Sequence, residues 1–421
     1  MKQFGKLLSL LGLTFALLVS SASCQPNQGE PVEETGSAEI SAVAEKITIR
    51  LCVDLFGGIN DMDIRPFLNL MIEKAPETAW TYDVVPLAEP ERDNYLTRLR
   101  TEILAGAGPD LFLCNCPISL IEGVFPFPKQ AANNHLFLPL DDYIENARLM
   151  EWDDLFPLVM SAGKTEDGQQ LLPLTYEFSM RLFDKDGPVP EIDRPMNWKQ
   201  MVETRDPCVE TAARAGLIFD IFGELADYDN DVPTFTEDAL LDGTKDYLSL
   251  EFHEVGIPIY WSDGWFDGGT GRTLALDENG KEYFMLPSYN LAGGVTANIC
   301  TFAAINRNTN YPQECFAALD YLLSREAQQK ERLYQCMRGW PVHMEVGSKD
   351  FPRNSKHMSE ENFSEFSLIR DQINAVKFYT PLEDTLYDIL VKWHSANQTD
   401  AELEKIVHKQ YTTVQMMIAE S

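Results

Sequence analysis

The sequence predicts an α/β fold with enough chain for two domains. Two observations support this prediction: strand patterns alternate with amphipathic helix patterns from about residue 46 onward, and the chain has 421 residues. Hydrophobic residues make up 44% of the chain and charged residues 24%, an ordinary globular composition. Alternating strands and helices imply a mostly parallel sheet, in which ligands bind beyond the carboxyl ends of the strands.

Residues 1–23 have the pattern of a secretory signal peptide. Lys2 and Lys6 precede an apolar run from Leu7 to Val19, and small residues follow that run. The run is shorter than a membrane-spanning helix needs, and no later apolar stretch reaches spanning length. We therefore expect this segment to direct export and then to be removed.

Cys24 directly follows the small residues Ser20 to Ser23. This arrangement resembles the lipobox of bacterial lipoproteins, in which the cysteine is lipid-modified, although Ser21 stands where those proteins usually have leucine. The resemblance implies lipidation at Cys24, and full secretion after ordinary cleavage is the alternative. Residues 24–45 are rich in Pro, Gly, Ser and Glu, so we expect a disordered tether before a folded part that begins near Lys46.

The chain is strongly acidic. Its formal net charge is −32, and removal of residues 1–23 takes away two lysines and no acid, which gives −34 for the mature protein. Such a charge argues against nucleic acid and against anionic lipid as partners. The lipid anchor would then be the only contact with a membrane.

Seven cysteines follow Cys24, an odd number without regular spacing: Cys52, Cys114, Cys116, Cys208, Cys300, Cys315 and Cys336. Several of them stand among apolar residues, where a cysteine behaves as a small buried hydrophobe. We therefore expect buried thiols rather than a disulfide framework.

The early part of the chain predicts a strand, a helix and a second strand. The alternating segment from Lys46 to Leu55 predicts the first strand, a helix from about Arg65 to Ala75 follows, and residues 81–87 predict the second strand. The next helix is expected over residues 95–104, where apolar side chains recur at helical spacing.

Glycines and a proline end that helix and lead into a third strand. Gly106 and Gly108 stop the helix, and Pro109 prevents its continuation. The apolar strand at residues 111–114 then delivers Asn115 to its carboxyl end, the position where a ligand would be met.

Several segments in order resemble the extracellular solute-binding proteins of ABC importers, specifically the family of maltose-type and multiple-sugar binding proteins. The first are AGAGPDLF at residues 105–112 and LFLPLDDYIEN at 136–146. LLPLTYEFSMRLFDKD at 171–186 resembles the segment in which that family first crosses between its lobes. Further matches are NWKQMVE at 197–203, the return strand and helix at 299–329, and RGWPVH at 338–343.

The resemblance implies a two-lobe periplasmic-binding-protein-like fold of type II, with the ligand cleft between the lobes and a hinge of several strands. It divides the folded part into an N-terminal lobe, residues 46–175 and 300–345, and a C-terminal lobe, residues 176–299 and 346–421. In the last segment, Thr399 and Asp400 form a cap signal before a helical pattern, and we expect this helix to pack on the second lobe.

The sequence contains no recognisable catalytic motif. Gly-x-Ser-x-Gly, His-Glu-x-x-His and the Gly-x-x-x-x-Gly-Lys-Ser/Thr phosphate loop are all missing, and GGTGRT at 268–273 lacks the lysine of such a loop. The six histidines show no metal-ligand spacing. We therefore expect a protein that is not an enzyme and that needs no cofactor and no metal.

Aromatic and polar residues suited to a sugar stand together in YWSDGWFDGG at 260–269. Sugar faces stack on aromatic rings and sugar hydroxyls pair with planar polar groups, which makes Trp261, Asp263 and Trp265 candidate ligand contacts. An aromatic core cluster is the alternative for each ring. The resemblance adds further candidates at matching positions: Asn60, Asp61, Asn115, Tyr176, Glu177, Trp265, Tyr289 and Trp340.

These expectations describe a monomeric, lipid-anchored protein on the extracellular face of the cell membrane or in the periplasm. The resemblance implies that it captures a carbohydrate, such as an oligosaccharide, and delivers it to ABC permease subunits. A receptor that hands its ligand to a membrane sensor would have the same fold. A secreted carbohydrate-active enzyme is the third alternative, and it would need two carboxylates in one cleft.

Overall fold

The structure is a computed structural model. It describes residues 47–55, 69–71, 73–74, 78–88, 90–116, 122–187, 189–251, 253, 255–259, 282–330, 337, 339–350 and 358–421. Residues Met1–Glu45 and Lys46–Ser421 form separate units, and the second of these is compact by itself. The signal peptide, the lipidation at Cys24 and the tether all lie outside the described residues. Among the described residues, no helix has both the length and the apolar character that crossing a membrane requires.

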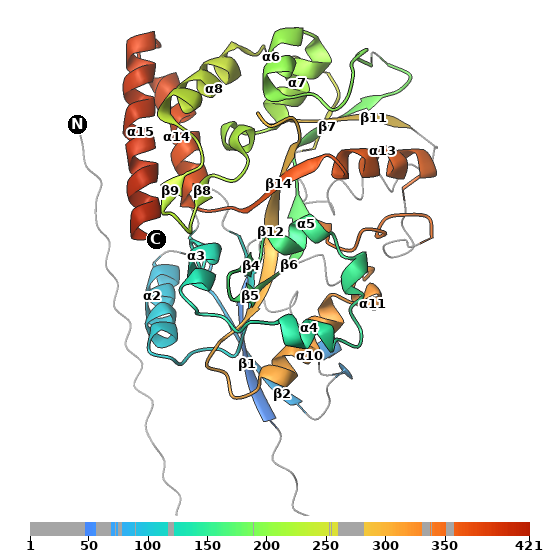
Figure 1. Ribbon diagram of the computed structural model, residues 1–421, viewed down its shortest axis with the longest axis vertical. Helices are drawn as coiled ribbons and strands as arrows, with labels where there is room; N and C mark the ends of the chain where they lie inside the picture. Colours follow the sequence, from blue (N-terminus) through green and yellow to red (C-terminus); the bar gives the residue numbers. More distant parts are fainter. Residues whose placement is uncertain are drawn as a thin grey trace, which may run out of the picture. The chain divides into compact units, whose positions relative to one another are not determined.

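The described strands and helices are shown in Figure 1. The strands are β1 Ile47–Asp54, β2 Thr78–Val84, β3 Leu111–Asn115, β4 Lys164–Thr165, β5 Gly168–Gln169, β6 Leu171–Glu177, β7 Met180–Asp184, β8 Ala226–Asp227, β9 Val232–Pro233, β10 Ile257–Ile259, β11 Tyr283–Pro287, β12 Val295–Ile305, β13 Trp340–Pro341 and β14 Ile373–Phe378. The helices are α2 Glu91–Leu104, α3 Pro128–Asn133, α4 Asp141–Glu145, α5 Pro157–Ser161, α6 Trp198–Thr204, α7 Pro207–Ala215, α8 Glu237–Ser249, α10 Pro312–Leu322, α11 Arg325–Gln328, α13 Glu360–Arg370, α14 Pro381–Ser395 and α15 Asp400–Glu420, with 3₁₀ turns η1 Trp152–Asp154 and η2 Ile218–Phe222.

The largest sheet has seven strands and is mixed rather than mostly parallel. Its order is β13-β6-β12-β3-β1-β2, and β14 pairs with β12. β1 is parallel to β2 and β3, as the alternation of strands and helices predicts. β12 is antiparallel to β3 and β6, however, because it enters the sheet on the return from the other part of the chain. The expected parallel pairing therefore holds for the first three strands and for the pair of β12 and β14, and the other pairs of this sheet are antiparallel.

The long strand β12 belongs to two groups of elements. Its first half pairs with β14, and its second half pairs with β3 on one side and β6 on the other. All of its residues are buried, which suits a strand covered on both faces. We call the elements around β1, β3 and β6 the first lobe, and those around β14, α7, α8 and α15 the second lobe (Figure 1).

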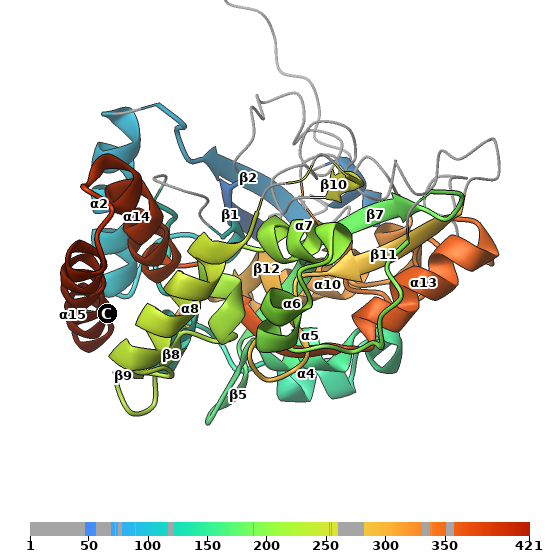
Figure 2. The ribbon, with the colours of Figure 1, turned by 90° about the horizontal axis from the view of Figure 1, so that it is seen from above.

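The second lobe combines a small sheet with several helices. β7 pairs antiparallel with β10 and β11, and α13 packs alongside β11 (Figure 2). α15 packs against α14 and α8, and α8 lies within residues 176–299, the range that the resemblance assigns to the C-terminal lobe. The N-cap of α15 is Thr399, whose side chain accepts a hydrogen bond from the backbone N–H of Glu402, as the sequence pattern predicts.

Some observed element boundaries differ from the predicted ones, because strand pairing or polar residues set them. The second strand covers residues 78–84 instead of 81–87, because its pairing with β1 starts at Ile47 opposite Thr78. α2 begins at Glu91, four residues before its apolar pattern, since acidic residues in the first turn of a helix are favourable. Residues 69–71 and 73–74 are helical, within the helix predicted between residues 65 and 75.

Candidate functional site

A row of polar side chains crosses the large sheet at the carboxyl end of β3. Thr301 of β12 is paired with Asn115 on one side and with Thr175 of β6 on the other. The Thr301 hydroxyl donates a hydrogen bond to Asn115 Oδ1 at 2.6 Å, and all three residues are buried. Asn115, predicted from its place after the third strand, therefore lies at the point where the two lobes share β12.

Three other predicted residues meet this row. Tyr176 and Glu177 follow Thr175 at the end of β6, and Trp340 of β13 is paired with Tyr176. Backbone pairing of β3, β12, β6 and β13 thus places Asn115, Tyr176, Glu177 and Trp340 on neighbouring strands, although they are far apart in the sequence; Tyr176 and Trp340 lie on the face of the sheet opposite to Asn115. We call these four residues the crossing cluster.

Phe178 and Phe366 pack against the two aromatic members of the crossing cluster, Tyr176 and Trp340. The distances between ring centroids are 6.4 Å for Tyr176 and Phe178, 5.8 Å for Phe178 and Phe366 of α13, and 4.4 Å for Phe366 and Trp340. Tyr176 is buried, and this burial raises the pKa of its hydroxyl. Trp340, which is 9% exposed, is the most accessible of these rings. The structure therefore uses Tyr176 for packing at the junction of the lobes.

Polar side chains alternate along the segment that leads from β6 to β7. Glu177, Ser179 and Arg181 are two residues apart in turn, and each is buried. A carboxylate, a hydroxyl and a guanidinium are groups that can pair with the hydroxyls of a sugar. Ser179 and Arg181 were not predicted, although the alternation in YEFSMR could have indicated them. Thr301 and Phe366 were also missed, because only strand pairing and tertiary packing place them here.

A buried ion pair fixes the loops beside this site. Arg92 of α2 donates to both carboxylate oxygens of Asp54, at 2.9 and 3.0 Å, and to the carbonyl oxygens of Pro86 and Glu122. Asp54 also accepts a hydrogen bond from the backbone N–H of Val124 at 2.9 Å. Burial raises the pKa of Asp54, and the charge of Arg92 opposes that change. The pair anchors the chain at the carboxyl end of β1.

Tyr289 lies elsewhere in the second lobe. Its hydroxyl donates to Gln372 Oε1 at 2.7 Å, and it forms a bridge with Val295 at the start of β12. Thr301 lies six residues further along that strand, which corresponds to about 20 Å. The structure therefore does not bring Tyr289 to the crossing cluster. Five other predicted contacts lie outside the described residues: Asn60, Asp61, Trp261, Asp263 and Trp265.

The described residues contain two groups of three side chains with metal-ligand chemistry. In the group of Glu151, Asp154 and His343, Arg325 donates to Glu151 at 2.9 Å and lies 3.4 Å from Asp154. A guanidinium therefore already supplies positive charge to both acids. We assign no metal to this group.

The second group has a basic partner of its own as well. It consists of Glu210, Glu251 and His253. Glu210 accepts hydrogen bonds from Arg205 at 3.0 Å and pairs with His253 at 2.7 Å, and these contacts lower the pKa of its carboxyl against the opposing effect of burial. We assign no metal here either.

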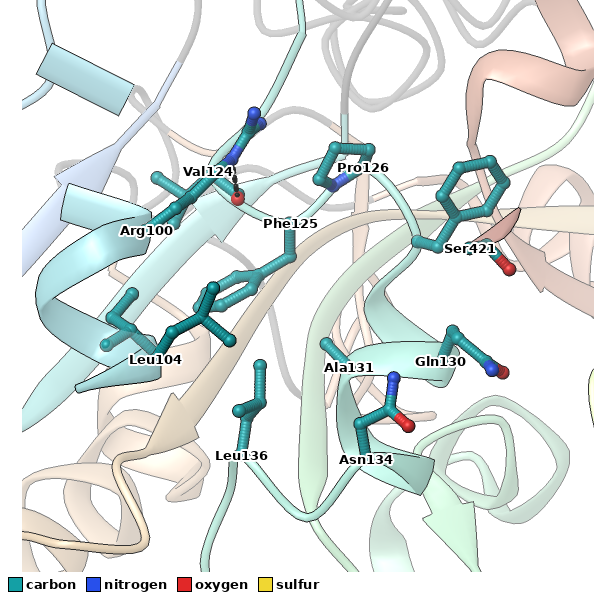
Figure 3. A pocket seen from close by; sticks show the side chains of 12 residues that line it. Arg100, Leu104, Val124, Phe125, Pro126, Gln130, Ala131, Asn134, Leu136 and Ser421 are labelled. Carbon is teal, nitrogen blue, oxygen red and sulfur yellow. Dashed lines mark hydrogen bonds between the residues drawn. The ribbon is translucent and has the colours of Figure 1, made fainter. Parts of the chain in front are cut away.

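A separate cavity of about 210 Å³ lies away from the crossing cluster, between α2, the segment before α3, and the C-terminal residue Ser421 (Figure 3). Leu104, Phe125 and Leu136 are among the apolar side chains that line it. Arg100 lies at its edge and donates to the carbonyl oxygen of Val124 at 2.9 Å. An apolar lining of this kind offers few partners for sugar hydroxyls, and the cavity shares no lining residue with the crossing cluster.

Comparison with solved structures shows which fold this is. A periplasmic oligogalacturonide binding protein from Yersinia enterocolitica matches with a TM-score of 0.56 at 12% identity, over 89% of this chain and 99% of that one. A family 1 extracellular solute-binding protein from Alicyclobacillus acidocaldarius matches with a TM-score of 0.55 at 13% identity, over 88% and 100%. A cyclic alpha-maltosyl-1,6-maltose binding protein from Arthrobacter globiformis matches with a TM-score of 0.53 at 14% identity, over 88% and 99%.

The chain therefore has the two-lobe fold of the periplasmic and extracellular solute-binding proteins, as the sequence predicts. Two chains described as designed esterases also match, with TM-scores of 0.55 and 0.56, so the fold by itself does not decide whether a protein is an enzyme. No protein-family model matches the sequence, and a search of curated proteins returns no match.

Proposed function

We propose that this protein is a solute-binding protein that captures a carbohydrate between its two lobes. The observation that best supports the proposal is the crossing cluster: the Asn115 amide and the Glu177 carboxylate stand on strands that pair with the shared strand β12, and the Trp340 indole stands on the next strand, β13. Sugars need both kinds of contact, because their C–H faces stack on rings and their hydroxyls pair with polar groups. Neighbours in fold that bind oligogalacturonide or maltosyl-maltose are consistent with this class of ligand.

Closure of the lobes is the proposed mechanism of capture. Glu177 stands where the chain leaves the first lobe. The ring of Trp340 packs against that of Phe366 of the second lobe, with 4.4 Å between the ring centroids. A ligand that contacts residues from both lobes stabilises the closed arrangement relative to the open one. No bond is broken in this process. The sugar is held and later released unchanged.

Delivery and anchoring complete the proposal. Lipidation at Cys24 and the tether at residues 24–45 would keep the binding unit close to the membrane, on the extracellular face or in the periplasm. A closed, loaded form would then dock on the permease subunits of an ABC importer. A membrane sensor in place of the permease is the second candidate, and the crossing cluster fits both alternatives.

A thermal-shift screen of the Lys46–Ser421 unit tests the ligand class. The screen compares mono- and oligosaccharides, polyols, amino acids and phosphorylated solutes, since binding to the native state raises the melting temperature. We expect a rise with one class of sugar, and chromatography should recover that sugar intact. A shift with a non-sugar class alone would contradict the carbohydrate proposal. Conversion of the sugar would contradict the expectation that this protein is not an enzyme.

A matched pair of variants locates the site. Glu177→Gln removes a buried charged acceptor at the crossing, and we expect it to weaken binding of the selected sugar by roughly tenfold or more. Glu282→Gln makes the same change at an exposed residue that pairs with Lys185 at 3.1 Å, and it should leave the affinity unchanged. Calorimetric titration measures both. Equal affinities in the two variants would place the ligand elsewhere.

A further inference from the structure

The two lobes also touch outside the strands that connect them. In this contact, α3 of the first lobe meets the β8–β9 hairpin of the second lobe. Lys129 Nζ lies 3.7 Å from Glu224 Oε1, and Asn133 Nδ2 donates to Asp229 Oδ1 at 3.2 Å. The Phe127 ring meets the Tyr228 ring edge-on, with 6.3 Å between their centroids. We call these three pairs of residues the α3 clasp.

The first-lobe side of the clasp is held by packing. α3 lies against β4 and β6, and Ala132 on this short helix is fully buried. Lys129 and Asn133 are four residues apart, so they share one face of α3. Both side chains therefore move with the first lobe when that lobe rotates.

The second-lobe side is held just as firmly. β9 packs against α15, and the hydroxyl of Thr234 donates to the carbonyl oxygen of Glu224. Asp227 accepts hydrogen bonds from the backbone N–H groups of Asp229 and Asn230, which fixes the turn of the hairpin. The acids that face α3 are consequently fixed to the second lobe.

Opposite charges attract the two sides of the clasp to each other. The hairpin region presents four acids within eight residues, Glu224, Asp227, Asp229 and Asp231, and α3 presents Lys129 to them. The whole chain has 66 acidic residues against 34 lysines and arginines, so its acidic surfaces repel one another. A lysine placed against an acidic hairpin is therefore a specific attraction between the lobes.

We propose that the α3 clasp sets how much of the protein occupies the lobe arrangement seen here, and thereby regulates ligand capture. A rotation about β12 and the β6–β7 connection that separates α3 from the hairpin must break all three contacts together. The apparent affinity of a binding protein scales with the fraction of molecules in the competent arrangement. Residues that touch no ligand therefore tune its capture. This regulatory role rests on the proposed function, whereas the conformational effect of the clasp does not.

Charge reversal and charge exchange test the clasp without any ligand. Spin labels at the exposed residues Glu145 of α4 and Glu404 of α15 report the distance between the lobes in the Lys46–Ser421 unit. Lys129→Glu places a carboxylate against Glu224, and we expect it to shift the ratio of lobe arrangements by roughly two- to tenfold. The double variant Lys129→Glu, Glu224→Lys restores the pair and should restore the wild-type distance distribution.

The control reverses a charge that lies within one lobe. Lys185→Glu breaks the exposed pair with Glu282 and should leave the distance distribution unchanged. An unchanged distribution in Lys129→Glu would overturn the proposal, and so would a shift that the double variant fails to reverse. A shift and its reversal in a protein that binds no sugar would support the clasp and count against the proposed function alone.

Discussion

At the scale of single residues, the crossing cluster is organised by the backbone. Asn115, Thr175 and Thr301 are neighbours because their strands pair, and the hydroxyl of Thr301 then bonds the Asn115 amide oxygen. Buried polar groups are costly unless they are paired, so a row of them at the junction of two lobes is more than core packing requires.

His343 provides a test at the residue scale that depends on pH. It follows β13 and is buried, and its Nδ1 accepts a hydrogen bond from the backbone N–H of Glu345 at 3.3 Å. Burial, and then the charge of Arg325, lowers its pKa in the folded state. Below the pKa of about 6.5 that an unperturbed histidine has, the unfolded chain gains a proton before the folded protein does, so acid destabilises the fold.

We therefore expect the free energy of unfolding to fall more steeply in the wild type than in His343→Gln between about pH 7.5 and about pH 5.5. Urea unfolding at a series of pH values measures this difference. His408→Gln is the control, since His408 is exposed on α15 and lies beside Glu237 at 3.1 Å. The same pH dependence in His343→Gln and the wild type would contradict a lowered pKa of His343 in the folded protein.

At the scale of secondary-structure elements, local signals and long-range pairing contribute differently. The end of α2 and the start of β3 could be predicted, since glycines and Pro109 stop a helix whatever surrounds it. The pairing of Trp340 with Tyr176 could be expected only through the family resemblance, because nothing in either local pattern selects the partner strand. The antiparallel entry of β12 was missed for the same reason.

A prediction at the scale of secondary-structure elements concerns the N-cap of α15. Thr399→Ala removes the side-chain acceptor for the Glu402 N–H, and we expect it to lower the free energy of unfolding by about 1 kcal/mol. Thr412→Ala makes the same change inside the helix, where alanine has the better helix propensity, so it should be neutral or slightly stabilising. Chemical denaturation measures both. Equal effects would contradict the role of Thr399 as a cap.

At the scale of the whole molecule, connecting strands and side-chain contacts both join the lobes. β12 passes through both, the rings of Trp340 and Phe366 meet at the crossing, and the α3 clasp joins them again at the β8–β9 hairpin. The two-lobe fold was predictable because motifs along most of the chain occur in a fixed order. The clasp was not, since Lys129 and Glu224 belong to short segments without any motif.

Small-angle X-ray scattering of the Lys46–Ser421 unit, with and without the sugar that the screen selects, tests the central claim most directly. Capture between two lobes predicts that saturating sugar lowers the radius of gyration, because closure brings the lobes together. The same titration in Glu177→Gln should require more sugar for the same change. Tight binding of an intact sugar with an unchanged scattering curve would contradict capture by closure.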